Sequence, residues 1–178
     1  MNLLSQYLTL DAVRLDVDVA SRKRLFEEAA FAVEAAYGEN HDAVFDALIA
    51  RERLGSTALG NGCAIPHGRL VSLAGPAVVL LRTKSPINYD APDGKPVRLF
   101  MTILVPTENP QAHLVLLRET AALFSDKALL QKLLDLPAPI DVCELIAAWN
   151  SPFATEGAEE NVQSPADSAD ANLQPSAQ

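Results

Sequence analysis

Residues 76–105 read PAVVLLRTKSPINYDAPDGKPVRLFMTILV and decide the fold. Two apolar runs, at 77–83 and 98–105, are bounded by Pro and Gly. Short, continuously apolar runs of this kind are typical of strands that are covered on both faces. The stretch between them, 85–96, is rich in Pro, Asp and Gly, which predicts a loop or short hairpin.

The chain before these strands predicts one more strand and two helices. Residues 12–19, AVRLDVDV, alternate apolar and polar side chains, the pattern of a half-buried strand. A helix is expected next, because Ser21 is a good N-cap, apolar residues recur at helical spacing, and Gly38 is a typical stop. A second helix should open at Asn40 or Asp42.

The chain after these strands predicts three helices. Asn109 and Pro110 form a cap and first-position pair that starts one helix. Two shorter helices are predicted at 126–136 and 141–149. Strands placed among helices in this way indicate an α/β fold with helices on both sides of a sheet, although the strand order does not follow from the sequence.

The composition divides the chain into a single domain, residues 1–150, and an acidic tail, residues 151–178. The tail carries five acidic residues, no Lys or Arg, and few large apolar residues. Such a segment cannot bury enough surface to offset its chain entropy, so we predict disorder, with an acidic interaction arm as the alternative.

The charge and hydropathy of the chain limit its partners and location. Lys and Arg total 14 against 23 Asp and Glu, for a net charge of −9 and a pI near 4.7. Negative charge opposes general binding to nucleic acid or to an anionic membrane. No apolar run approaches the roughly 18 residues of a membrane helix, and the N-terminus lacks the basic region of a signal peptide. We therefore expect a cytoplasmic protein, with Cys63 and Cys143 as reduced thiols.

Residues 55–68, GSTALGNGCAIPHG, hold four of the eight glycines in the chain. This density is unlike a helix or an ordinary strand and predicts a loop whose backbone N–H groups, around Gly60 and Gly62, converge on a phosphate. The spacing matches neither a Walker A loop nor a dinucleotide fingerprint. A tight connection with close backbone packing is the alternative interpretation.

The presence of His67 indicates that this segment takes part in phosphoryl transfer. A neutral imidazole is a nucleophile that accepts a phosphoryl group without a separate base. His113 could bond the phosphoryl oxygens, Arg51 offers a charged fork, and Ser56 and Thr57 add hydroxyl donors. Positioning and charge stabilisation of this kind are what phosphoryl transfer needs.

Two other chemistries compete for the same residues. Cys63, His67 and His113 could bind zinc, but Pro66 excludes the regular helix that would bring Cys63 and His67 onto one face. A serine hydrolase would need Ser56 as nucleophile, yet the G-x-S-x-G elbow is missing. We therefore expect neither a metal nor a cofactor.

The run RERLGSTALGNGCAIPHGR, residues 51–69, closely resembles the active-site segment of the mannitol/fructose-class enzyme IIA proteins (EIIA type 2) of the phosphoenolpyruvate-dependent phosphotransferase system (PTS). It is most similar to the nitrogen-regulatory type, and the resemblance covers roughly residues 3–150. It implies a mixed sheet sandwiched between helices. It also implies that a histidine phosphocarrier protein phosphorylates His67, and that His113 and Arg51 support the phosphoryl group. Cys63, where an aliphatic residue is more usual, and the acidic tail depart from the family pattern.

Two functions follow from this resemblance, and a third stays open. In the first, phosphorylation of His67 regulates partner proteins, such as potassium-transport or sensor proteins in the nitrogen-type family. In the second, a sugar-transport enzyme IIA passes the group to a IIB domain of a fructose or mannitol permease. The absence of a fused IIB or membrane domain favours the regulator. A binding module with a vestigial site is the third, which the joint presence of His67, His113 and Arg51 opposes.

Overall fold

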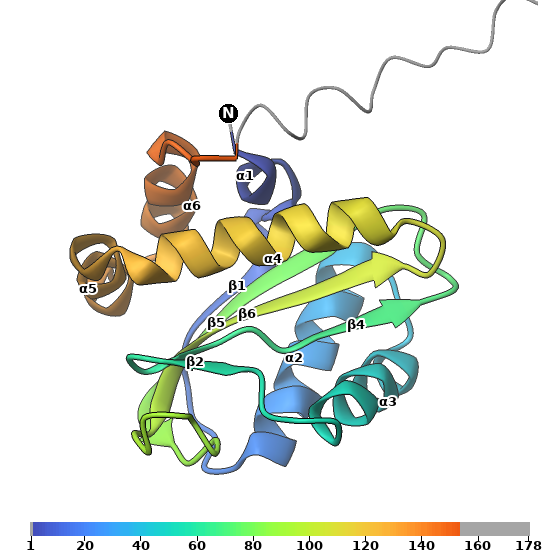
Figure 1. Cartoon of the computed structure of the whole chain (residues 1–178), viewed down its shortest axis with the longest axis horizontal. Helices are drawn as coiled ribbons and strands as arrows, with labels where there is room; N and C mark the ends of the chain where they lie inside the picture. The colour runs from blue at the N-terminus through green and yellow to red at the C-terminus, as the bar shows by residue number, and fades with distance from the viewer. Residues whose placement is uncertain (1, 154–178) are drawn as a thin grey trace, which may run out of the picture.

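Two antiparallel strands, β5 (Ala77–Ile87) and β6 (Val97–Pro106), form the centre of the sheet (Figure 1). The computed structural model describes residues 2–153. Both strands lie where the apolar runs predicted them, and most of their side chains are buried. β5 extends to Ile87, beyond the predicted end, because a register shift between Arg82 and Ile87 accommodates Pro86 in the pairing.

The other four strands of the described residues flank this pair in a mixed sheet of order β1-β5-β6-β3-β2. β1 (Val13–Val17) runs parallel to β5, and its side chains alternate between buried and exposed as predicted. On the far edge of β6, β3 (Cys63–Ala64) and β4 (His67–Leu70) pair with it in parallel, one after the other. β2 (Ala58–Gly60) pairs antiparallel to β3.

The glycine-rich segment 55–68 therefore contains strands, and our expectation of a continuous loop was wrong. The glycines lie where the strands turn or need space. Gly60, Asn61 and Gly62 form the turn between β2 and β3, with φ values of 92°, 54° and 77°. This left-handed backbone favours glycine, so the glycine count reflects a tight hairpin.

Helices cover both faces of the sheet (Figure 1). α2 (Arg22–Tyr37) packs on β5 and α3 (His41–Glu52) on β4, behind the sheet in this view. α4 (Pro110–Ser125) packs on β6 at the front, followed by α5 (Lys127–Asp135) and α6 (Pro139–Ala148). The predicted α/β fold with a mixed sheet between helices is confirmed.

The helix ends follow the predicted caps. Ser21 caps α2, and Gly38 ends it with a left-handed φ of 75°. Asn40, the first of the two candidates, caps α3, and Asn109 caps α4 ahead of a proline at its first position. α6 begins two residues before its predicted start, at Pro139, another residue suited to a first helical turn.

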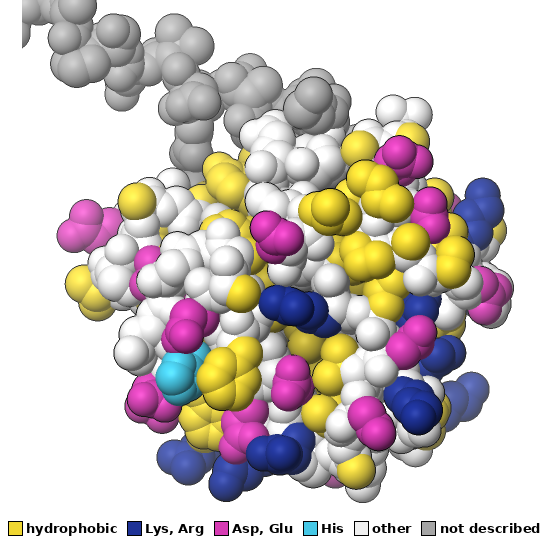
Figure 2. All heavy atoms as spheres, turned by 180° about the vertical axis from the view of Figure 1, so that it is seen from behind, with side chains coloured by type: hydrophobic (Ala, Val, Ile, Leu, Met, Phe, Trp, Pro, Cys, Tyr) yellow, Lys and Arg dark blue, Asp and Glu magenta, His cyan; other side chains and the backbone are white. Residues whose placement is uncertain are grey.

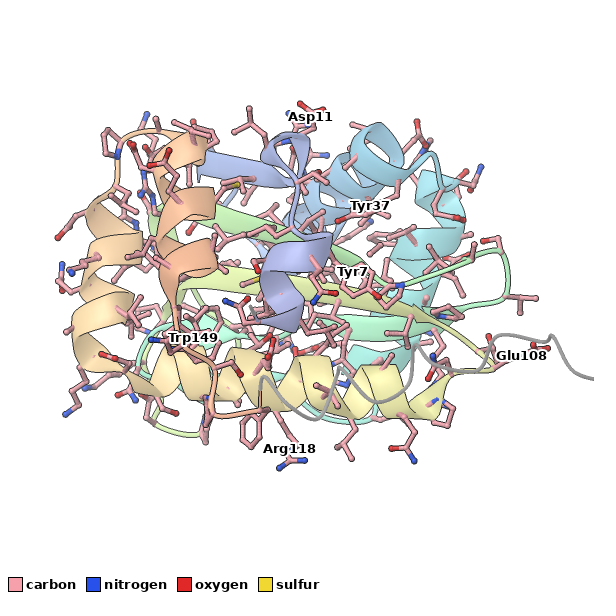
Figure 3. The ribbon with its side chains drawn as sticks, turned by 90° about the horizontal axis from the view of Figure 1, so that it is seen from above. Tyr7, Asp11, Tyr37, Glu108, Arg118 and Trp149 are labelled. Carbon is pink, nitrogen blue, oxygen red and sulfur yellow. The ribbon has the colours of Figure 1, made fainter. Side chains whose placement is uncertain are left out.

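One short helix, α1 (Leu3–Tyr7), was not predicted. Its first turn is held by distant residues: Glu119 of α4 accepts the Leu4 N–H at 3.0 Å, and the Asn2 amide donates to the Ile146 and Trp149 carbonyls. In Figure 3, Tyr7 lies beside Tyr37, whose hydroxyl bonds the Tyr7 carbonyl. A five-residue helix has little stability of its own, so these tertiary contacts determine it.

The described chain ends beside α4, where the Arg118 guanidinium lies 4.2 Å from the centre of the Phe153 ring. Arg118 is on the outer side of α4 (Figure 3). The predicted acidic tail lies outside the described residues from position 154 onward. Within residues 2–153, no helix is both long and apolar enough to cross a membrane.

Candidate functional site

His67 is the first residue of β4 and is half-buried. Its Nδ1 atom lies 2.7 Å from the Ile65 carbonyl, and its Nε2 atom lies 3.1 Å from Nε of Arg51. A carbonyl oxygen only accepts and an arginine N–H only donates, so these contacts place the ring proton on Nδ1. The lone pair is therefore on Nε2, which makes Nε2 the nucleophilic atom.

The pKa of His67 lies below its usual value, mainly because burial disfavours the charged ring and also because of the nearby Arg51 charge. A lowered pKa keeps the imidazole neutral at pH 7. The ring is therefore nucleophilic without a separate base.

Arg51 reaches His67 from the last turn of α3. Besides donating from Nε to Nε2 of His67, it donates from an Nη atom to the Gly55 carbonyl at 2.9 Å. Gly55, with a φ of 149°, begins the turn away from the helix. The guanidinium is thus held on two sides at the point where a group bound to Nε2 would lie.

Gly68 lets α3 approach β4 closely enough for this contact. A Cβ atom at Gly68 would lie 3.2 Å from the Ala47 carbonyl oxygen and 3.3 Å from the Ala47 Cβ. These contacts are with backbone and with a side chain too short to move aside. A side chain at position 68 would therefore push α3, and Arg51 with it, away from His67.

We expect Gly68→Ala to lower both stability and phosphoryl transfer. Overpacking of this kind costs about 1–3 kcal/mol of the free energy of unfolding. Urea unfolding would measure that loss, and the rate of phosphorylation would report the displacement of Arg51. The matched control is Gly75→Ala, because a Cβ there meets nothing within 4 Å. Equal behaviour of the two variants would contradict the close-packing role of Gly68.

His113 brings a second imidazole to the site from the start of α4. Its ring centre is 5.3 Å from that of His67, and the two planes meet at 64°. Burial, with the nearby charges of His67, Arg69 and Arg51, lowers the pKa of His113 to about 4. Within residues 2–153, the buried Nδ1 atom has no hydrogen-bond partner. His113 is therefore neutral at pH 7.

A hollow of about 430 Å³ joins these groups; it is lined by Ala47, Ala50, Arg51, Leu54, His67, Gly68, Arg69 and His113. The structure thus brings together Arg51, His67 and His113, as the sequence predicted. It also adds Arg69, which sequence reasoning missed. Arg69 is two residues beyond His67 on β4, so the two side chains share one face of the strand. Recognising 67–70 as a strand would have found it.

The four residues predicted to bind phosphate do not line this hollow. The Ser56 hydroxyl donates to the Tyr89 carbonyl at 2.9 Å, and the buried Thr57 hydroxyl donates to Glu52 at 2.7 Å. In the β2–β3 turn, a Cβ on Gly60 would meet the Asp93 carboxylate at 3.3 Å, and Gly62 neighbours Pro96. The Asp93 carboxylate would repel a phosphate at this turn, and all four residues lie outside the hollow that contains His67.

Within the part of the chain that it describes, the structure does not assemble the residues that a zinc site or a serine hydrolase would need. Cys63 is a buried residue of β3, and burial raises the pKa of its thiol to about 12. Among residues 2–153, no group of three His, Cys, Asp or Glu side chains could hold a metal. Ser56 donates to the Tyr89 carbonyl, which leaves it no histidine base.

Comparisons with known proteins agree with this geometry. Residues 6–149 match the family described as "Phosphoenolpyruvate-dependent sugar phosphotransferase system, EIIA 2". A nitrogen regulatory protein of Pseudomonas aeruginosa is 41% identical over 121 residues, which cover 67% of this chain and 79% of that protein. A nitrogen regulatory protein of Klebsiella oxytoca is 35% identical over 149 residues, covering 83% and 92%.

A solved structure extends the likeness to three dimensions. The crystal structure of nitrogen regulatory protein IIA-Ntr from Neisseria meningitidis matches with a TM-score of 0.77 and 41% identity, over 82% of this chain and 99% of that one. The fold, the segment around His67 and these relatives lead to one conclusion. This chain belongs to the EIIA type 2 family of the phosphoenolpyruvate-dependent sugar phosphotransferase system.

Proposed function

We propose that this protein is a nitrogen-type enzyme IIA that accepts a phosphoryl group on Nε2 of His67 from a histidine phosphocarrier protein. The observation that carries the proposal is the pair of contacts that leave Nε2 unprotonated and directed at Arg51. The likeness to nitrogen regulatory proteins supports the choice of type.

The bonds that form and break involve two histidines, His67 and the phosphorylated histidine of the carrier. The Nε2 lone pair attacks phosphorus as the bond from phosphorus to the carrier's histidine nitrogen breaks, and the carrier's ring keeps that electron pair. The Nδ1 proton stays on His67, where the Ile65 carbonyl at 2.7 Å stabilises the positive charge that the ring acquires. The new P–N bond is of the same kind as the one that breaks, so transfer is readily reversible.

Three side chains would stabilise the moving phosphoryl group. Arg51 is in contact with Nε2, and Arg69 and His113 line the same hollow. Two guanidinium groups supply positive charge, and the neutral ring of His113, which also lines the hollow, supplies one hydrogen bond. Positioning and charge of this kind account for most of the catalysis of phosphoryl transfer.

Regulation would follow from the charge change at this hollow. A phosphoryl group adds about −1.5 to −2 charges near neutral pH, against the two arginines of the hollow. Leu54 at its rim is 84% exposed, an apolar contact point beside the switch. Partner proteins, of which potassium-transport and sensor proteins are the proposed class, would thus meet a cationic surface in one state and a nearly neutral one in the other.

The test has two steps: phosphorylation of the protein by a carrier, and then transfer of the phosphoryl group from the protein to a IIB domain. We expect phosphorylation by phosphoenolpyruvate, enzyme I and a nitrogen-type phosphocarrier to add one acid-labile phosphoryl group, seen by intact mass. Little should then pass to a fructose or mannitol IIB domain. Rapid transfer to such a domain would favour the sugar-transport role that the family description also allows. No labelling by any carrier would contradict both.

We expect His113→Ala to slow labelling by about tenfold to a hundredfold without abolishing it, since it removes one hydrogen bond to the phosphoryl group. Because the pKa of His113 is about 4, its charge does not change above pH 5.5. A fall in rate as the pH is lowered to 5.5 would therefore come from another group, such as His67, whose pKa burial lowers, and it should persist in the variant. Loss of that fall in His113→Ala would show that His113 is the titrating group.

A further inference from the structure

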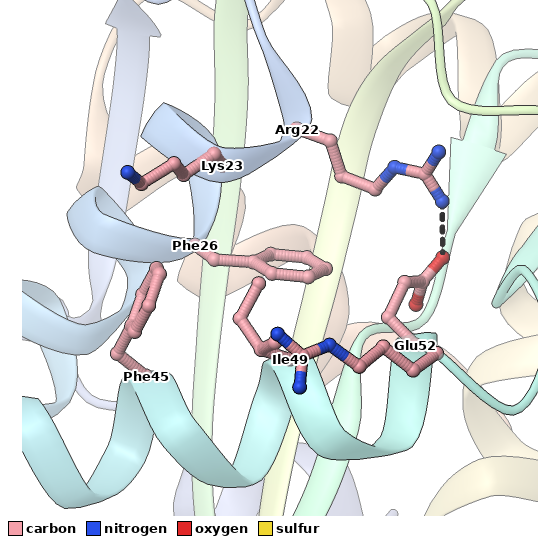
Figure 4. Close-up of a pocket in the computed structure, with 7 residues that line it drawn as sticks. Arg22, Lys23, Phe26, Phe45, Ile49 and Glu52 are labelled. Atoms are coloured by element: carbon pink, nitrogen blue, oxygen red, sulfur yellow. Dashed lines mark hydrogen bonds and ion pairs between the residues drawn. The ribbon is translucent and has the colours of Figure 1, made fainter.

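A second hollow, of about 590 Å³, lies between the start of α2 and the end of α3 (Figure 4). Its floor is apolar: Phe45 and Ile49 are half-buried and face the hollow, and the fully buried Phe26 ring lies beneath them. Small-molecule sites commonly have volumes of about 300–1,000 Å³ and mostly apolar walls with a few polar groups. This hollow has both properties.

Three cations surround this floor. Arg22 lies at one end, where it is paired with Glu52 at 3.3 Å and with Asp90 (Figure 4). Lys23 lies toward the other end, near Phe45, and Arg53 completes the lining. Within residues 2–153, no carboxylate lies within ion-pair distance of Lys23 or Arg53.

The positive charge here is unusual for this protein, whose net charge is −9. Of the seven side chains that line the hollow, Glu52 is the one acid, and it is already bonded to Arg22 and to Thr57. Figure 2 shows Lys and Arg side chains gathered along the lower edge of this face, where α2 begins. A ligand that combines an apolar group with negative charge would match both the floor and the rim.

We propose that the hollow between α2 and α3 binds small organic carboxylates that carry an aromatic or branched aliphatic group. The apolar group packs on the half-buried Phe45 and Ile49, and the carboxylate lies between Lys23 and Arg53. The hollow is on the opposite side of α3 from the phosphoryl-transfer hollow, since Arg51 lines one and Arg53 the other. Binding therefore does not depend on the proposed function of His67.

The experiment is an amide-detected NMR titration of the full chain with 3-phenylpropionate. A ligand of about eleven non-hydrogen atoms should reach a Kd of about 1 mM. We expect saturable shifts at the start of α2 and the end of α3. The neutral 3-phenylpropanamide and the ringless propionate should each bind at least about tenfold more weakly. The absence of saturable shifts, or equal binding of the neutral amide, would overturn the proposal.

Variants locate the site. The double variant Lys23→Gln with Arg53→Gln should raise the Kd for 3-phenylpropionate by about tenfold. Both side chains are exposed, so the variant should fold normally. The matched control is Arg24→Gln with Lys127→Gln, which removes the same charge outside the hollow and should change the Kd less than twofold. His67→Ala should bind normally. Equal weakening by both pairs would show non-specific attraction and overturn the site.

Discussion

Replacing His67 with Ala should abolish phosphorylation by the carrier, with labelling falling to background. Nε2 is the one atom of the hollow that combines a lone pair, neutrality at pH 7 and contact with Arg51. Deleting it removes the acceptor, so no slower route through the same step remains. Intact mass before and after acid treatment, on wild type and variant in parallel, would measure the effect.

The fold should survive this change. The half-buried His67 ring makes one hydrogen bond to backbone, to Ile65, and a bond of this kind contributes about 0.5–1.5 kcal/mol. His41→Ala is the matched control, because His41 is the one histidine of the chain outside the proposed site. It lies at the start of α3 and is paired with Glu34. Full labelling of His41→Ala is expected. Residual acid-labile label on His67→Ala would assign the acceptor to another residue.

Replacing Arg51 with Ala should slow labelling by about a hundredfold, the cost of removing one charged donor from a developing anion. Arg51→Lys should recover only part of this loss. Lysine keeps the charge but has no fork that can contact Nε2 of His67 and the Gly55 carbonyl together. Stopped-flow or quenched labelling with a fixed concentration of phosphocarrier would measure the rates.

Arg53→Ala is the control for this series, because Arg53 is two residues further on and faces the other side of α3. Its labelling rate should stay within about twofold of wild type, as for other exposed charges. The Arg51 variants should also respond differently to salt, since ions screen an exposed charge and compete for the hollow. Equal rates for Arg51→Ala and wild type would remove Arg51 from the site.

The elements that were predicted correctly depend on local chemistry. Ser21, Asn40 and Asn109 each bond the backbone three residues ahead, so a helix start is visible in a few letters of sequence. The apolar runs of β5 and β6 are equally local signals, because a strand that is covered on both faces buries mostly apolar side chains. Element type and position follow from such signals.

The elements that were missed depend on distant residues. The α1 helix is held by Glu119, more than a hundred residues away, and no local signal marks it. The short strands β3 and β4 form on the edge of β6, which supplies their hydrogen bonds, and β2 in turn pairs with β3. Treating 55–68 as a loop hid the alternation that places Arg69 beside His67.

The sequence by itself determined which residues we propose for the site: a histidine between proline and glycine, a second histidine on a capped helix, and an arginine at a helix end. Only the tertiary structure decided which ring nitrogen is free. That outcome rests on the Ile65 carbonyl and on Arg51, which the close contact of α3 with Gly68 brings to the ring. Hydrogen-bond direction depends on positions in space, and these are set by packing between elements distant in the chain.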